Sequence, residues 1–285
     1  MVILSKSQNE AFNEIKSFLN SEQKIFILKG YAGTGKTTLI NHLSKYLTQC
    51  RIQFNIMAST GRAAKIASDK INIPVYTIHK SIYSMDDIKE KQITKEDGSV
   101  TFKYFYSLKE NQLPKKSLCI VDESSMISDK FSDGEFFTFG SGKLLNDLFL
   151  FSNHPPYYDR KILFIGDDAQ LPPVNMNFSP ALDEKYLTVE YKCQCRTYSL
   201  NEVLRQDKHS GIMINSKHLR EQITKNIYNK FQLIFNDNDF QKITETELYD
   251  KYLHLYNQKA NPIIIAYSNK SISWYNQTIR SKIYT

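Results

Sequence analysis

A glycine-rich turn between an apolar run and an amphipathic segment constrains this chain more than any other feature. Residues 25–28 are all apolar, and the sequence at 30–37 reads G-x-x-x-x-G-K-T. A buried strand, a glycine turn and a helix start in this order form a P-loop, whose backbone N–H groups enclose a polyphosphate. The start of the helix adds the positive end of its dipole. The pattern predicts nucleotide binding; the alternative is an ordinary strand–helix turn.

The residues of this motif have distinct expected roles. Lys36 should reach the terminal phosphates, and the hydroxyl of Thr37 should hold a magnesium ion. The glycines let the backbone approach the phosphates closely. The expected nucleotide-binding residues of the loop are Gly30, Ala32, Gly33, Thr34, Gly35, Lys36, Thr37 and Thr38.

Whole-chain properties narrow the class of protein. A length of 285 residues allows one large or two ordinary domains, and 41% apolar residues exclude a largely disordered chain. A net charge of +7 suits a polyanionic partner, although solvated lysines alone would give the same value. The four cysteines do not form a disulfide framework, and no apolar segment reaches the roughly 18 residues of a membrane span. We expect a reduced, cytoplasmic protein with no membrane partner.

The alternation of strand and helix patterns predicts an α/β fold. Ser7 and Glu10 are expected to form a capping box at the first helix. Continuous apolar runs are typical of parallel strands that are covered on both faces, so we expect a doubly wound parallel sheet in a domain over 1–182. The expected strands lie at 24–29, 54–58, 118–123 and 162–167.

Two parts of the chain depart from this rhythm. Residues 93–104, with a turn at Asp97-Gly98 and alternation on the second arm, predict a β-hairpin within an insertion over 86–115. Beyond 182 the composition changes, and a second, partial α/β domain is expected over 183–285. Its expected elements are strands at 187–191 and 262–267 and helices near 199–208, 212–226 and 269–283.

Acidic and amide side chains follow two of the expected buried strands. Asp122 would hold magnesium, and Glu123 would orient and activate the attacking water. The alternative is a solvated Asp-Glu pair at a strand end. Gln170, in the segment that follows the strand at 162–167, carries an amide that can donate to a γ-phosphate and accept from a water molecule. We expect Lys36, Glu123 and Gln170 to act in catalysis.

The motifs together resemble the superfamily 1B DNA helicases of the RecD/Dda type. Gln8 resembles the adenine-reading glutamine of that family, and Leu204-Arg205-Gln206 resembles the motif whose arginine approaches the γ-phosphate. The other matching segments are 30–37, 58–64, 77–79, 122–126 and 166–174, with a weaker match at 267–270. Their order over residues 8–206 is what makes the resemblance specific.

The resemblance implies an ATP- and magnesium-dependent helicase that moves 5′→3′ on single-stranded DNA in replication, recombination or repair. ATP would lie between two RecA-like domains, with Arg205 as a catalytic residue. Single-stranded DNA and duplex junctions would be the partners of a monomeric chain. As alternatives, Thr60 is a plain helix cap and His79 an ordinary loop histidine. The DNA contacts that the resemblance implies are Thr60, Arg62, Thr77, His79 and Asn269.

The resemblance also leaves open points. Later motifs of the second RecA-like domain are not found in these residues, so we expect the 285 residues alone to bind ATP–magnesium weakly and to hydrolyse it poorly. The hairpin is either a strand-separating pin, with Phe102, Tyr104 or Phe105 against the last base pair, or a solvated excursion. The alternative functions are a non-motor nucleic-acid-binding P-loop ATPase and, less well supported, a small-molecule P-loop phosphotransferase.

Overall fold

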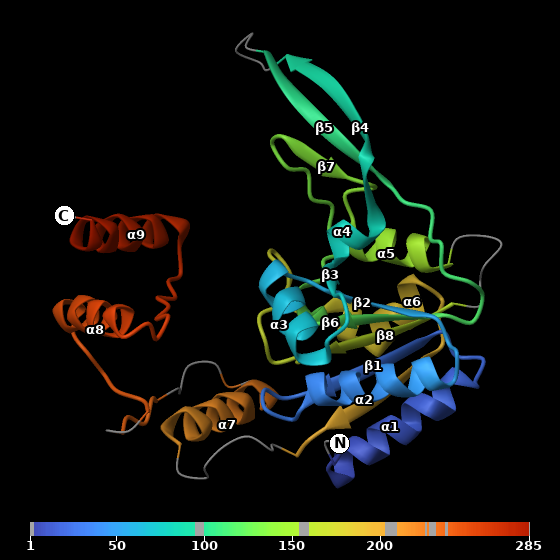
Figure 1. Cartoon of the computed structure of the whole chain (residues 1–285), viewed down its shortest axis with the longest axis horizontal. Helices are drawn as coiled ribbons and strands as arrows, with labels where there is room; N and C mark the ends of the chain where they lie inside the picture. Colours follow the sequence, from blue (N-terminus) through green and yellow to red (C-terminus); the bar gives the residue numbers. More distant parts are fainter. Residues whose placement is uncertain are drawn as a thin grey trace. The chain divides into compact units, whose positions relative to one another are not determined.

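The chain forms two compact units, which we describe separately. The computed structural model describes residues 3–94, 100–153, 160–202, 210–225, 227, 232–236 and 239–284. Unit 1 comprises Met1–Gln206 and unit 2 comprises Asp207–Thr285 (Figure 1). In the described residues no helix is long and apolar enough to cross a membrane.

Unit 1 is built on a six-stranded parallel sheet of the predicted doubly wound α/β class. The strand order is β3-β2-β6-β8-β1-β9, so β8 separates the P-loop strand β1 from β6, which carries the acidic pair. The four predicted strands are all present, and β3 and β9 extend the sheet at its two edges. The strands are β1 (Ile25–Gly30), β2 (Phe54–Ala58), β3 (Tyr76–Thr77), β6 (Leu118–Asp122), β8 (Lys161–Gly166) and β9 (Cys195–Leu200).

Helices cover both faces of this sheet, as the continuous apolar strands predicted. Phe26 and Leu28 of β1 pack with the first group of helices, whereas Ile25 and Ile27 pack with the second group. Successive strand residues point to opposite faces, so an all-apolar strand contributes to two cores. The first group is α1 (Lys6–Leu19), α2 (Lys36–Gln49) and α3 (Gly61–Ile71); the second is α4 (Ile78–Ile82), α5 (Leu144–Asn153) and α6 (Glu184–Glu190).

Two sequence predictions about helix positions were wrong. Ser5, not Ser7, caps α1, and Gln8, not Glu10, completes the capping box. Residues 187–191 were predicted as a strand, but 187–190 lie in α6, because Asp183 accepts a hydrogen bond from the backbone N–H of Tyr186 and starts a helix there.

The compact unit also extends beyond the expected boundary at residue 182. After α6 the chain forms β9, which pairs in parallel with β1 along its whole length, from Ile25↔Cys195 to Gly30↔Leu200. The backbone hydrogen bonds of β1 on that side are therefore satisfied by β9. Pairing of β9 with the P-loop strand places residues up to Gln206 in unit 1.

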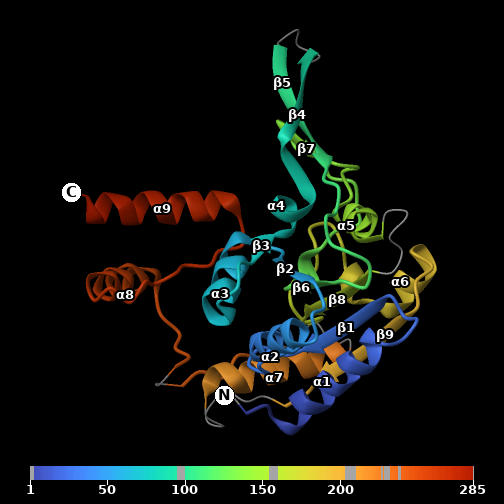
Figure 2. The same ribbon diagram turned by 45° about the vertical axis from the view of Figure 1, so that its right-hand side comes forward.

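The predicted hairpin insertion is present and projects from the α/β core (Figures 1 and 2). Strand β4 (Tyr83–Thr94) pairs antiparallel with β5 (Val100–Leu108), and the predicted turn at Asp97-Gly98 lies outside the described residues. The segment that follows β6 contributes β7 (Phe137–Phe139), which pairs in parallel with β5. The insertion is thus a three-stranded sheet.

A buried polar contact and stacked rings fix the base of this sheet. The hydroxyl of Tyr83 donates to the Asp147 carboxylate of α5 at 2.7 Å, and both residues are buried. The ring of Phe139 lies against Tyr83, His79 and, stacked at 4.7 Å, Tyr106. The insertion is therefore packed onto the α/β core, not merely tethered to it.

The described residues of unit 2 form three helices: α7 (Gly211–Thr224), α8 (Glu245–Asn257) and α9 (Asn269–Ile283). The predicted helices at 212–226 and 269–283 correspond to α7 and α9, whereas α8 was not predicted. The predicted strand at 262–267 is not formed: no strand is described in unit 2, so its backbone has no sheet partner there. Ile265 and Tyr267 of this segment are fully exposed.

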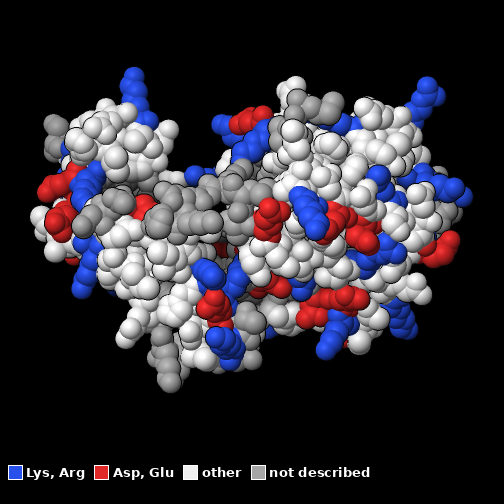
Figure 3. Space-filling view, turned by 90° about the horizontal axis from the view of Figure 1, so that it is seen from below, with Lys and Arg blue, Asp and Glu red and all other residues white. Residues whose placement is uncertain are grey.

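The net charge of +7 is not gathered into a single patch on the face that Figure 3 shows. The described Lys and Arg side chains there are interspersed with Asp and Glu. An even mixture of charges favours solubility, whereas a continuous basic tract would favour binding to a polyanion. On this face, charge alone does not indicate a nucleic-acid surface.

The Tyr83–Asp147 contact gives a test of how the insertion is anchored. We expect Tyr83→Phe to lower the free energy of unfolding by about 1–3 kcal/mol, because the buried Asp147 carboxylate loses its phenol donor. Urea unfolding would measure the change. Tyr76→Phe is the matched control, since Tyr76 is about half exposed. Loss of its hydroxyl should lower the free energy of unfolding by less than about 0.5 kcal/mol. Equal effects of the two variants would contradict this anchoring role.

Candidate nucleotide-binding site

The P-loop has the backbone conformation that phosphate binding requires. Gly33 and Gly35 have positive φ angles of 85° and 78°, and Gly35 is the N-cap of α2 without a side-chain cap. The first N–H groups of α2 therefore lack a side-chain acceptor and face outward from the helix start. A side chain at Gly30 would lie only 2.8 Å from Thr34 Oγ1, so the tight loop also needs glycine there.

Lys36 is held inside the loop. Its Nζ atom donates to the carbonyl oxygens of Gly30 at 2.7 Å and Tyr31 at 3.2 Å. The side chain is largely buried, and its charge lies close enough to Asp122 to lower the pKa of that carboxyl group. Lys36 and Asp122, 86 residues apart in sequence, are thus close enough to interact electrostatically.

Gln8 connects the N-terminal helix to the P-loop. Its Nε2 donates to the carbonyl oxygens of Thr34 and Gly35 at 3.1 and 3.3 Å, and its Oε1 accepts from the N–H of Ser5. Gln8 is only 2% exposed. The amide that was predicted to read adenine is therefore engaged with the loop backbone.

The acidic pair lies at the carboxyl end of β6. Burial, followed by the neighbouring charge of Glu123, raises the pKa of Asp122 to about 6, against the opposing effects of the Glu123 N–H and the Lys36 ammonium. Glu123 adopts a left-handed conformation with φ of 51°, which is uncommon for a residue other than glycine. Its Oε2 is buried and has no hydrogen-bond partner among the described residues.

A cavity of about 290 Å³ brings together two of the predicted catalytic residues, Glu123 and Gln170. It is lined from different elements by Thr37 of α2, the acidic pair after β6, and Gln170. Lys29 of β1 forms an ion pair at 3.2 Å with Asp168, which ties the Gln170 segment to the P-loop strand. The remaining lining residues are Ser59, Thr60, Arg62, Ala63, Ile66, Ala67, Ser125 and Met126.

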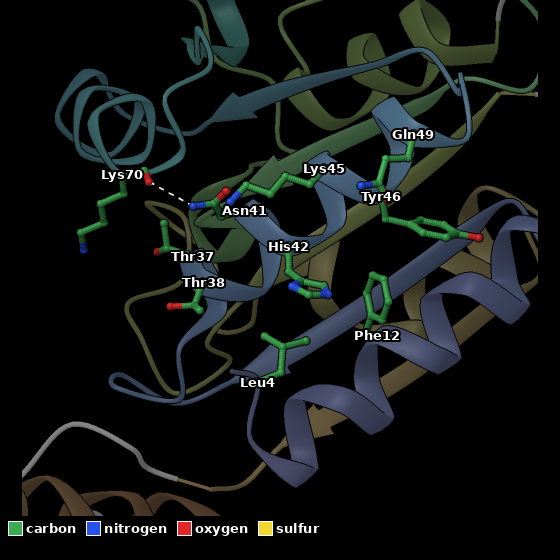
Figure 4. A pocket seen from close by; sticks show the side chains of 10 residues that line it. All are labelled: Leu4, Phe12, Thr37, Thr38, Asn41, His42, Lys45, Tyr46, Gln49 and Lys70. Carbon is green, nitrogen blue, oxygen red and sulfur yellow. Dashed lines mark hydrogen bonds between the residues drawn. The ribbon is translucent and has the colours of Figure 1, made fainter. Parts of the chain in front are cut away.

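A second cavity of about 460 Å³ lies along α2, next to the first (Figure 4). Its rings come from two helices: Phe12 of α1 packs edge-on against His42 and Tyr46 of α2 at 4.9 and 5.4 Å. Thr37 lines both cavities. The remaining lining residues are Leu4, Thr38, Asn41, Lys45, Gln49 and Lys70.

Most of the predicted DNA contacts lie in unit 1, where they also have structural partners. Thr60 and Thr77 cap α3 and α4, and their Oγ1 atoms accept from the N–H groups of Ala63 and Lys80. Each hydroxyl keeps its proton for a further acceptor. His79 packs between rings, and burial lowers its pKa, which favours the neutral imidazole.

The other predicted DNA contacts vary in placement. Arg62 is exposed on the first turn of α3. Asn269 is exposed at the start of α9, in unit 2. Arg205 lies outside the described residues.

Two serines were missed at this site. Ser59 and Ser125 line the 290 Å³ cavity, and the hydroxyl oxygen of each is buried without a hydrogen-bond partner in the described part of the chain. The signal was available in the sequence, because each lies within three residues of the end of a buried strand. The sequence interpretation assigned the neighbouring Thr60 and Glu123 instead.

Comparisons with known proteins agree with the site. The AAA domain family model matches residues 3–133, which include the P-loop and the acidic pair. The chain is 23% identical over 264 residues to the human DNA replication ATP-dependent helicase/nuclease DNA2, covering 76% of this chain and 23% of that protein. These matches support the resemblance of this chain to the P-loop helicases of superfamily 1B.

The chain also matches a viral protein. It is 28% identical over 319 residues to the uncharacterized protein R530 of Acanthamoeba polyphaga mimivirus, covering 99% of this chain and 57% of that one. The chain thus spans about half the length of this relative, and less than a quarter of the human helicase/nuclease.

Two solved helicase structures align with parts of this chain at low sequence identity. The crystal structure of Pif1 helicase from Candida albicans aligns with a TM-score of 0.46 and 20% identity, covering 77% of this chain and 44% of that one. Bacteroides sp Pif1 in complex with ADP-AlF4 aligns with a TM-score of 0.44 and 19% identity, covering 81% and 48%. At these scores the likeness adds nothing to the assignment, which rests on the motifs and the P-loop domain match.

The raised pKa of Asp122 leads to a prediction about how the free energy of unfolding depends on pH. Its charged form costs stability above a pH of about 6, and that cost disappears as the pH falls below the unfolded value near 3.8. We expect Asp122→Asn to raise the free energy of unfolding at pH 7.5 by on the order of 1–3 kcal/mol without nucleotide. Asparagine keeps the oxygen that accepts from the Glu123 N–H at 3.0 Å.

Chemical unfolding at pH 7.5 and at pH 4.5 would measure this effect. The gain should shrink at the lower pH, where Asp122 in the parent protein is largely protonated. Added magnesium and nucleotide should stabilise the parent more than the variant. A gain of the same size at both pH values would show that the cost does not come from ionisation of Asp122.

Proposed function

We propose that the chain is the ATP-hydrolysing part of a DNA helicase or translocase. The observation that carries the proposal is the position of Thr37, which lines both cavities. A nucleotide whose phosphates lie on the P-loop would extend its nucleoside into the ring-lined 460 Å³ cavity and its γ-phosphate toward the acidic pair. Ligand cavities of drug-sized molecules measure about 300–1,000 Å³, so the two spaces together suit one nucleoside triphosphate.

The residues present fit a magnesium ion. Thr37 offers a hydroxyl and Asp122 a carboxylate, the hard oxygen donors that magnesium prefers. Asp122 is buried beside a second carboxylate, which is unfavourable until a cation neutralises them. When bound, magnesium would neutralise charge on the phosphates. Thr37 and Asp122 are the residues that would hold it.

Glu123 and Gln170 are the proposed hydrolytic residues. The buried, unpartnered Oε2 of Glu123 is free to accept a proton from an attacking water, and Gln170 lines the same cavity with its amide. Lys36 would exchange its carbonyl partners for phosphate oxygens. Arg205 is proposed, from the family resemblance alone, to approach the γ-phosphate.

The DNA-binding surface is proposed to comprise residues at or just after the carboxyl ends of β2 and β3. Thr60 and Arg62 line the 290 Å³ cavity at the start of α3, and Thr77 is the N-cap of α4. A DNA strand bound to these residues would therefore respond to whether ATP or its product occupies the site. Movement 5′→3′ and strand separation follow only from the resemblance. Phe102, about half exposed on β5, is the best placed of the three hairpin rings for contact with a base pair, since Tyr104 stacks on Phe137 and Phe105 lies beneath Lys91.

Two alternative functions predict different results. A small-molecule phosphotransferase would turn over ATP without response to single-stranded DNA, whereas a non-motor ATPase would respond to DNA but not separate strands. ATP hydrolysis with and without oligothymidylate distinguishes the first alternative, and unwinding of a 5′-tailed against a 3′-tailed duplex distinguishes the second. Stimulation by DNA with unwinding of the 5′-tailed duplex supports the helicase.

Substitutions in the two motifs should separate binding from hydrolysis. We expect Lys36→Ala to weaken nucleotide affinity at least tenfold, because the phosphates lose their cation. Glu123→Gln should leave affinity unchanged and lower the rate of hydrolysis by about 10²–10⁴-fold, because an amide cannot act as a base. Fluorescent-nucleotide titration and single-turnover hydrolysis measure these two quantities. Equal loss of affinity in both variants would contradict the assigned roles.

A further inference from the structure

Ser59 and Glu123 are neighbours through the register of two parallel strands. Ala58 of β2 pairs with Asp122 of β6, so the next residues on both strands lie side by side at the carboxyl edge of the sheet. Both line the 290 Å³ cavity. Neither the hydroxyl oxygen of Ser59 nor Oε2 of Glu123 has a hydrogen-bond partner among the described residues, although both atoms are buried.

Two buried polar groups that lack partners and line the same cavity are candidates for a contact that forms in another state of the protein. A buried polar group without a hydrogen-bond partner is unfavourable. A serine hydroxyl is a donor that rotates freely, and an ionised glutamate only accepts. The pair is therefore chemically matched, with Ser59 donating and Glu123 accepting.

Ser59 is also adjacent to the proposed strand-contact residues. It directly precedes Thr60, the N-cap of α3, and Arg62 lies exposed on the first turn of that helix. A phosphate drawn to Thr60 and Arg62 would shift the backbone that carries Ser59. Ser125, the other unpartnered serine, lies on the same segment as Glu123 and would not respond to the strand directly.

We propose that Ser59 is a positioning residue that couples strand binding to hydrolysis. When a nucleic-acid strand contacts Thr60 and Arg62, the Ser59 hydroxyl donates to Glu123 and turns its carboxylate toward the attacking water. Without the strand this bond is absent, and Glu123 is poorly oriented. The inference rests on the proposed function and adds to it the residue through which DNA stimulates ATP hydrolysis.

The test compares Ser59→Ala and Ser59→Thr with the parent protein. Ser68→Ala is the matched control, because Ser68 lies in the last turn of α3, the helix that follows Ser59, and its hydroxyl donates to the Ile73 carbonyl. Single-turnover ATP hydrolysis is measured with and without oligothymidylate, and nucleotide affinity is measured separately. We expect Ser59→Ala to lower the DNA-stimulated rate about tenfold, since a misplaced catalytic group costs that much or more.

In the same experiment Ser59→Ala should lower the DNA-stimulated rate by a larger factor than the unstimulated rate, and its nucleotide affinity should match the parent. Ser59→Thr should retain stimulation because it keeps the hydroxyl, and Ser68→Ala should behave like the parent. Full stimulation of Ser59→Ala, or an equal loss of both rates, would overturn the role of Ser59 while leaving ATP hydrolysis in place. A parent protein that binds ATP without hydrolysing it, with or without DNA, would overturn the proposed function and this role with it.

Discussion

Parallel pairing of β1, β2, β6 and β8 is the constraint on which the rest of the structure depends. Because parallel strands all end at the same edge of the sheet, the P-loop, the acidic pair and the Gln170 segment converge there from distant parts of the sequence. The pairing Ala58↔Asp122 also brings the α3 segment beside the acidic pair. One backbone arrangement thus fixes both the nucleotide site and the residues proposed to contact DNA.

The site holds polar groups whose cost the fold has to offset. The raised pKa of Asp122, the left-handed backbone at Glu123 and the unpartnered serine hydroxyls all make the free protein less stable. The two apolar cores on either side of the sheet provide the compensating stability. These unfavourable groups are concentrated at one edge of the sheet, outside the two apolar cores. Perturbed polar groups gathered in this way are typical of ligand sites.

Much of the fold and of the nucleotide site could be predicted from the sequence, because local patterns determine them. Continuous apolar runs identified the four central strands, and a P-loop between strand and helix identified the phosphate site. Positions 187–191 were mistaken because a β-branched pair outweighed the Asp183 cap, and β9 was missed because edge strands carry a weaker apolar signal. The role of Gln8 depends on bonds to residues 26 and 27 positions away, which no local pattern reveals.

The bonds of Gln8 have a consequence for how nucleotide selectivity works in this protein. Its Nε2 donates to the backbone of the P-loop, and its Oε1 completes the capping box of α1. The side chain therefore stabilises the phosphate-binding loop. The rings of Phe12, His42 and Tyr46 offer a purine mainly shape and apolar surface. Because Gln8 holds the loop backbone, we expect its substitution to alter affinity for inorganic triphosphate as well as for ATP.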